Sequence, residues 1–234
     1  MPGTPSREDF RTTRWSLISE AQWAGAGSDR QARLDELCLR YWAPVSLYLG
    51  RNGYPAETID GLTRAFFDQL LHEGIDRAAG HRRFRTFLLG ELQQFLARHP
   101  VDAPLPEPLL PLPATCDASP PAATGTPEQA LHRGFALEVI SHAMARLRAE
   151  AEQAGRLRMF EQLQRYLSSE PAADDYTADA KVLGARTVFV AMAVRRLRER
   201  FREMVDDELA QLVSTAGEFA RERAALLEAL ERTA

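Results

Sequence analysis

Hydrophobic residues recur every three or four positions along most of this chain, which is the spacing of one face of an α-helix. In the first hundred residues the pattern predicts four helices. The first begins near Arg14, and the second spans about 34–49 with a bend or restart at Pro44. The third and fourth occupy about 56–71 and 83–98. Four such amphipathic helices are expected to form one small bundle.

The same spacing predicts a second block of helices in the remainder of the chain. A long helix runs from Pro127 toward Glu152, and a shorter one covers about 157–167. The stretch 176–205 has the pattern of two helices with a tight turn between them, and a last helix follows Gly217. Ala, Leu, Arg and Glu dominate the composition, and runs of β-branched residues are scarce. The sequence therefore predicts an all-α fold.

A proline-rich stretch separates the two blocks. Residues 100–127 hold nine of the fourteen prolines, three acidic residues and no basic residue. Proline interrupts helices, and the few apolar side chains here show no period. We therefore predict an extended acidic linker over 100–127, between one domain at 1–99 and a second domain at 128–234.

The stretch 176–205 has the spacing of a helix-turn-helix. Ala180 supplies a small residue where the second helix crosses the first, and Gly184 suits a left-handed turn. An apolar stripe follows at Val190, Val194, Leu197, Phe201 and Met204. Residues 176–204 carry seven Lys/Arg and three Asp/Glu, a net charge of +4 in a chain of net charge −4. This surface suits contact with phosphate, but a solvated amphipathic helix would show the same charges.

Composition limits the class of protein. A hydrophobic content of 45% is enough for real cores, and a net charge of −4 excludes a protein that coats nucleic acid by bulk charge. No apolar run approaches the length of a membrane span, and the N-terminus lacks the apolar core of a signal peptide. We therefore expect a cytoplasmic protein with no membrane partner, and free thiols at Cys38 and Cys116.

Motifs for catalysis and metal binding are absent from the sequence. The five histidines lack a two-ligand helical spacing with a partner carboxylate, so no metal site is expected. The chain has no glycine-rich phosphate loop and no nucleophile elbow. Asp60, Asp68 and Glu73 are near one another, but charges on a helix face usually mark only solvent exposure. We expect no catalytic residue and no cofactor, and therefore no enzyme.

Five motifs, taken in order, carry a resemblance to a known family. They are FRTTRWSLI (10–18), ELCLRYWAPV (36–45), GLTRAFFDQLL (61–71), RFRTFLLGELQQFLA (83–97) and the helix-turn-helix. Together they resemble the extracytoplasmic-function group of bacterial RNA polymerase sigma factors, in the sigma-70 family. The resemblance implies a protein that binds core RNA polymerase and directs transcription initiation at specific promoter DNA. It also implies an anti-sigma factor as a further partner.

The resemblance implies roles for individual residues. Contact with a coiled coil of the polymerase is expected on the third predicted helix, at Asp60, Leu62, Thr63, Arg64, Phe66, Phe67, Gln69 and Leu70. The two phenylalanines in this set must also fill the bundle core. The second helix of the helix-turn-helix is expected to place four residues in the major groove: Arg186, Thr187, Phe189 and Ala191. Three arginines are expected to contact the DNA backbone: Arg195, Arg196 and Arg198.

Several positions depart from the pattern of the family. The segment 62–67 reads LTRAFF where LTQEFF is typical, and Gln93 and Gln94 stand where relatives are often more basic. Asp179 occupies a position that is usually aliphatic and inward, so either the helix rotates or the carboxylate finds a partner. The segment 187–193, TVFVAMA, has few groups that read base edges. Two alternatives therefore stay open: a sigma-like paralogue that binds polymerase or a regulator without promoter recognition, and a stand-alone DNA-binding regulator.

Overall fold

The computed structural model describes residues 28–70, 84–101, 125–172, 174–213 and 215–231. Over these ranges the chain is mainly helical and holds no strand, so the predicted all-α fold is confirmed. The predicted helix near Arg14, the motif at 10–18 and most of the predicted linker lie outside the described residues.

The helices follow the apolar spacing closely. The predicted second helix is a single helix, α2 (Ser28–Arg51), which continues through Pro44. The other elements of the bundle region are α3 (Ala56–Gln69), α5 (Phe84–Arg98) and α10 (Ala216–Glu231). The remaining elements are α6 (Pro127–Gln153), α7 (Leu157–Leu163), the short 3-10 helix η2 (Gln164–Leu167), α8 (Asp175–Leu183) and α9 (Thr187–Ala210).

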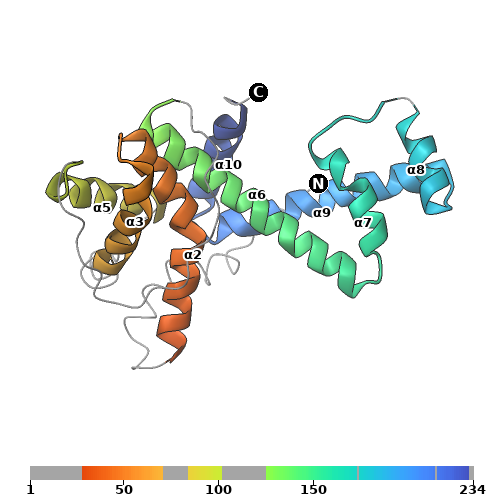
Figure 1. Cartoon of the computed structure of the whole chain (residues 1–234). Helices are drawn as coiled ribbons and strands as arrows, with labels where there is room; N and C mark the ends of the chain where they lie inside the picture. Colours follow the sequence, from red (N-terminus) through yellow and green to blue (C-terminus); the bar gives the residue numbers. More distant parts are fainter. Residues whose placement is uncertain (1–27, 71–83, 102–124, 173, 214, 232–234) are drawn as a thin grey trace. The chain divides into compact units, whose positions relative to one another are not determined.

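The chain divides into two compact units. One comprises the described residues of 139–208, and we call it the helix-turn-helix unit. The other comprises the described residues before 139 and from 209 onward, and we call it the bundle unit. Figure 1 shows the elements of both units. Helix α6 contributes its first part to the bundle unit and its second part to the helix-turn-helix unit.

This division differs from the predicted boundaries at 100 and 128. Residues 128–138 and 209–231 were assigned by sequence to the second domain, but they belong to the bundle unit. Packing explains the difference, because Phe135 of α6 is buried with its ring 4.9 Å from that of Tyr41.

An ion pair ties the last helix to the same unit. Glu222 of α10 is buried, and its carboxylate lies 3.1 Å from the guanidinium of Arg85 on α5. Arg51 at the end of α2 donates from Nε to the carbonyl of Gly125, just before α6, at 2.8 Å. These contacts attach both chain segments that flank the helix-turn-helix unit in sequence to the bundle unit.

Helices α2 and α6 approach each other closely at Gly134. A Cβ atom added there would lie 2.6 Å from the Cα atom of Pro44 and 3.1 Å from its Cβ atom. Real Cβ atoms do not come so close to backbone, so any larger residue would push the two helices apart. Glycine at this position is therefore required by packing, although it costs helix propensity.

We expect Gly134→Ala to lower the free energy of unfolding of the bundle unit by about 1–3 kcal/mol, through overpacking. Urea denaturation followed by tryptophan fluorescence reports on this unit, because Trp42 is buried in it and residues 139–208 contain no tryptophan. Gly90→Ala on α5 is the matched control, since no described heavy atom lies within 4 Å of a Cβ built there. The control should raise stability by up to ~1 kcal/mol through helix propensity. Equal changes in the free energy of unfolding for Gly134→Ala and Gly90→Ala would contradict the close approach of α2 and α6 at Gly134.

Candidate nucleic-acid interface

The turn between α8 and α9 has the geometry that the sequence predicted. Gly184 caps α8 in a left-handed conformation, with φ 63° and ψ 32°. The amide of Ala185 donates to the carbonyl of Ala180 at 2.9 Å, which closes the end of α8. Ala180 is buried between the two helices, as a small residue at a crossing should be. Three residues, 184–186, then separate α8 from α9.

A small hydrophobic core holds the two helices together. Its buried members come from α7, η2, α8 and α9, and they are Leu163, Tyr166, Ala180, Val190 and Val194. Further along α9, Met204 is buried against a second cluster that includes Phe160, and Leu197 and Phe201 are partly buried. The predicted apolar stripe of α9 is therefore confirmed as the face that packs against the rest of the unit.

Asp179 lies in this core and finds partners there. Its side chain is 2% exposed and accepts hydrogen bonds from Tyr166 Oη at 2.6 Å and Gln162 Nε2 at 2.8 Å. Arg165 Nη2 donates to both carboxylate oxygens, at 2.9 and 3.0 Å. Burial acts to raise the pKa of Asp179, but the hydrogen bonds from Tyr166, Gln162 and Arg165 outweigh it, so the pKa lies below its ordinary value. The sequence left open whether the helix rotates or the carboxylate is paired, and the structure shows a paired carboxylate.

Arg198 is used inside the helix-turn-helix unit. Its Nε donates to the carbonyl of Tyr166 at 2.8 Å, and its Nη2 donates to the carbonyl of Ser169 at 3.0 Å. The carboxylate of Glu170 lies 3.5 Å away. These contacts hold the end of η2 against α9. The guanidinium of Arg198, which was predicted to contact DNA phosphate, therefore stabilises the fold of the unit.

The other predicted cations of α9 point to solvent. Arg195 is exposed and paired with Glu199 at 3.0 Å, an i,i+4 contact on an open surface that is worth little. Arg186 and Arg196 are exposed, and their side chains have no hydrogen bond or ion pair within the described parts of the chain. Lys181 on α8 is in the same situation. Lys181, Arg186, Arg195 and Arg196 together give α8, the turn and the first half of α9 an exposed set of positive charges.

Four apolar side chains of α8 and α9, on either side of the turn in sequence, are exposed, and we call them the apolar patch. Its side chains are 46–63% exposed, and they are Val182, Val188, Phe189 and Met192. Of the predicted groove residues, Thr187 and Phe189 belong to this exposed surface, while Ala191 is half-buried. Sequence reasoning missed Val182, Val188 and Met192. For Val188 and Met192 the signal was present, because both lie on α9 off the buried stripe of Val190 and Val194.

The predicted polymerase-binding residues lie on α3 or, for Leu70, at its C-terminal cap, and most of them are buried. Five are buried in the bundle unit, namely Leu62, Thr63, Phe66, Phe67 and Leu70. The rings of Phe66 and Phe67 pack on those of Phe95 and Trp42. Thr63 donates to the carbonyl of Ile59 at 2.7 Å.

Three residues of the predicted set remain accessible on α3. Asp60 is exposed and pairs with the partly exposed Arg64 at 3.1 Å, and Gln69 is half-buried. The Arg64 guanidinium also lies 5.5 Å from the centre of the Trp42 ring. The solvent-facing part of the predicted site is therefore a narrow strip of polar side chains.

Comparison with known proteins found no relative of this chain. No family model matches the chain, and neither the curated proteins nor the solved structures include a significant match.

Within the described ranges, none of the helices has both the length and the apolar character that a membrane crossing requires. The described residues also contain no group of three or more His, Cys, Asp or Glu placed to hold a metal ion.

Proposed function

We propose that this chain is a sigma-like transcription factor that uses α9 to dock on promoter DNA. The observation that carries the proposal is the free N-terminal part of α9. It follows a left-handed turn, has exposed side chains at 187–189, and is accompanied by the exposed cations Lys181, Arg186, Arg195 and Arg196. Helix-turn-helix proteins place the N-terminal residues of their second helix against base edges, with flanking cations on phosphates.

The chemistry of this surface suggests what DNA it would prefer. Arginine recognises guanine through two hydrogen bonds, and Arg186 is the group placed to do so. Val188, Phe189 and Met192 have no hydrogen-bonding groups, but apolar side chains contact the methyl group of thymine in the major groove. We therefore expect a short element rich in thymine with a guanine at one end. The polar strip of Asp60, Arg64 and Gln69 on α3 would supply a contact to core polymerase.

Two assays with the full chain test this proposal. Purified protein and core RNA polymerase should co-elute on gel filtration, and the mixture should give run-off transcripts from promoters selected by genome-wide crosslinking. The replacement of Asp60, Arg64 and Gln69 by Ala should weaken co-elution. Exposed Gln93 and Gln94 on α5, replaced by Ala, are the control in the same unit. Absence of both co-elution and run-off transcription would refute the proposal.

A second candidate function is a sigma-like protein that binds polymerase or a regulator without reading a promoter. The observation that favours it is the apolar patch of Val182, Val188, Phe189 and Met192, because exposed clusters of this kind commonly mark protein interfaces. In that case co-elution with polymerase persists while run-off transcription is absent. A stand-alone DNA-binding regulator would instead bind DNA and fail to co-elute.

A further inference from the structure

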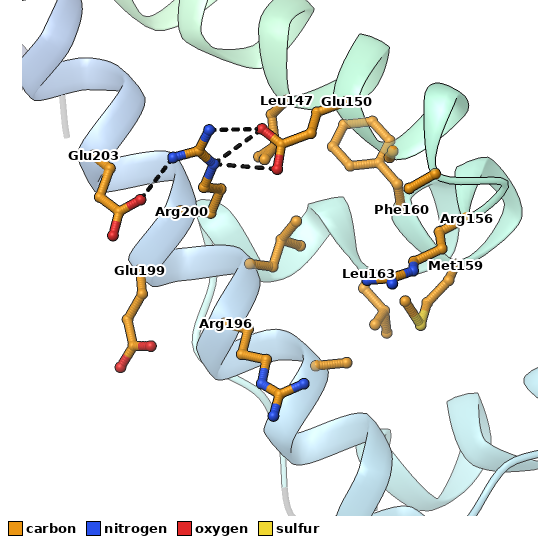
Figure 2. A pocket seen from close by; sticks show the side chains of 14 residues that line it. Leu147, Glu150, Arg156, Met159, Phe160, Leu163, Arg196, Glu199, Arg200 and Glu203 are labelled. Carbon is orange, nitrogen blue, oxygen red and sulfur yellow. Dashed lines mark hydrogen bonds and ion pairs between the residues drawn. The ribbon is translucent and has the colours of Figure 1, made fainter.

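A pocket of about 400 Å³ opens in the helix-turn-helix unit, between the end of α6, helix α7 and the middle of α9 (Figure 2). Its floor is apolar and is formed by Leu147, Phe160, Leu163 and Leu197. All four are buried or partly buried members of the two core clusters of this unit. A volume of this size is at the lower end of the usual range for small-molecule sites.

Charged side chains surround the opening, and most of them are neutralised by neighbours. Arg200 donates to Glu150 at 2.9 Å and to Glu203 at 2.8 Å, as the dashed lines in Figure 2 show. Glu199 accepts from Arg195 at 3.0 Å. Each acidic group of the rim therefore already has a cation beside it.

Two arginines at the rim lack such a partner. Arg156 precedes α7 and Arg196 lies on α9, so the two line the pocket from different elements, as Figure 2 shows. Within the described ranges, neither guanidinium takes part in a hydrogen bond or an ion pair. Each guanidinium can therefore form bidentate hydrogen bonds with a bound anion without first breaking an existing contact.

We propose that this pocket binds a small anionic amphiphile, a carboxylate with a medium-chain aliphatic or aromatic body. The apolar body would lie on the floor and against the half-buried Met159 and Leu197, and its own surface would leave water, which is favourable in proportion to the area buried. The carboxylate would lie between Arg156 and Arg196. An inorganic anion has no apolar part to place on the floor, and a cationic ligand placed between Arg156 and Arg196 would meet two guanidinium groups of like charge.

Binding would act on the same elements that present the candidate nucleic-acid interface. Helices α7 and α9 both line the pocket, and α9 also carries the exposed face. A ligand that binds only the folded unit stabilises it in proportion to the logarithm of its concentration above Kd. The proposal does not depend on DNA binding, and its test needs no DNA.

Methionine methyl groups give a direct test in the full chain. Met159 lines the pocket, whereas Met192 belongs to the exposed apolar patch outside it. In protein labelled with carbon-13 at the methionine methyls, decanoate should shift the Met159 signal saturably and leave Met192 unchanged. Decanol has the same chain and no charge, so it should bind at least roughly tenfold more weakly. An unshifted Met159, or equal shifts of both signals, would overturn the proposal.

Charge variants complete the test. The double change Arg156→Gln and Arg196→Gln should weaken decanoate binding roughly tenfold and leave decanol binding unchanged. Arg202→Gln with Arg221→Gln is the matched control, because it removes the same number of charges from exposed arginines that do not line the pocket. Equal affinities of decanoate and decanol for the native protein, or an equal loss in this control, would show nonspecific adsorption and refute the site.

Discussion

Asp179→Ala is expected to lower the free energy of unfolding of the helix-turn-helix unit by about 2–4 kcal/mol, which is a large part of the stability of a small domain. The change removes the acceptor of four short hydrogen bonds, one of them from the buried hydroxyl of Tyr166. The Tyr166 hydroxyl would still accept from Arg165 Nη2 at 3.0 Å, but its own buried proton would have no acceptor, while the exposed Arg165 can also reach water. Chemical denaturation followed at the methyl signal of buried Met204 reports on this unit alone.

The double variant Tyr166→Phe with Asp179→Leu is the control for this prediction. It removes the buried hydroxyl together with the buried carboxylate and leaves apolar side chains in their place. Replacement of a buried polar pair by apolar groups of similar size is often nearly neutral, whereas removal of one partner is costly. We therefore expect the double variant to be close to the native protein. A loss as large as that of Asp179→Ala would show that the position tolerates no change for reasons of packing.

The same network makes stability depend on pH in a defined direction. The folded-state pKa of Asp179 is lowered, so the carboxylate holds its proton less tightly in the folded than in the unfolded chain. Its contribution is therefore complete above the ordinary carboxyl pKa of about 3.9 and is lost as the pH falls through the folded-state value. Below about pH 4 the native unit should lose stability more steeply than the double variant, which has no carboxyl group at this position.

Sequence reasoning found the elements of this site but not the partners within it. Gly184 and the stripe of Val190 and Val194 follow directly from turn chemistry and helical spacing. The partners of Asp179 do not, because Gln162 and Tyr166 lie on a preceding segment whose last turn is a 3-10 helix. A change from α to 3-10 geometry rotates the side chains that follow, and no apolar spacing marks where it occurs.

The division of the chain was harder to predict for a different reason. The prolines of 100–127 indicated a linker, but a linker in sequence need not coincide with the boundary between cores. Helix α6 carries apolar residues for two cores in succession, with Phe135 in the bundle unit and Ala143 in the helix-turn-helix unit. The spacing of apolar residues predicts which face of a helix is buried, but it does not predict which other helix packs against that face.

Replacing Arg186, Arg195 and Arg196 together by Gln is expected to weaken binding to a selected promoter fragment by about a hundredfold at low salt. The argument rests on three exposed guanidinium groups, none of which belongs to the core of the unit. Loss of three phosphate contacts should also reduce the slope of log affinity against log salt by about 2.7, or about 0.9 for each contact. Fluorescence anisotropy of a labelled duplex across a salt series measures both quantities.

Matched variants separate contact with DNA from general effects of charge. Arg202, Arg221 and Arg223 are exposed arginines away from the turn, and their replacement by Gln makes the same change in net charge. This control should leave the salt slope nearly unchanged, because phosphate contact depends on position and not on total charge. Arg198→Gln should act differently, by lowering stability through the lost bonds to Tyr166 and Ser169. Equal slopes for the two triple variants would argue against docking through α9.

The apolar patch decides between the two proposed functions. If α9 enters the major groove, the change of Val188, Phe189 and Met192 to Ser should reduce the preference for thymine over cytosine, with a cost of about 1–3 kcal/mol for each lost base contact. Binding to nonspecific DNA should be nearly unaffected, since the arginines remain. If the patch instead binds a protein, the same variant should bind every duplex as the native chain does and should fail to co-elute with its protein partner. The two functions predict different results for this one variant, so the pair of assays distinguishes them.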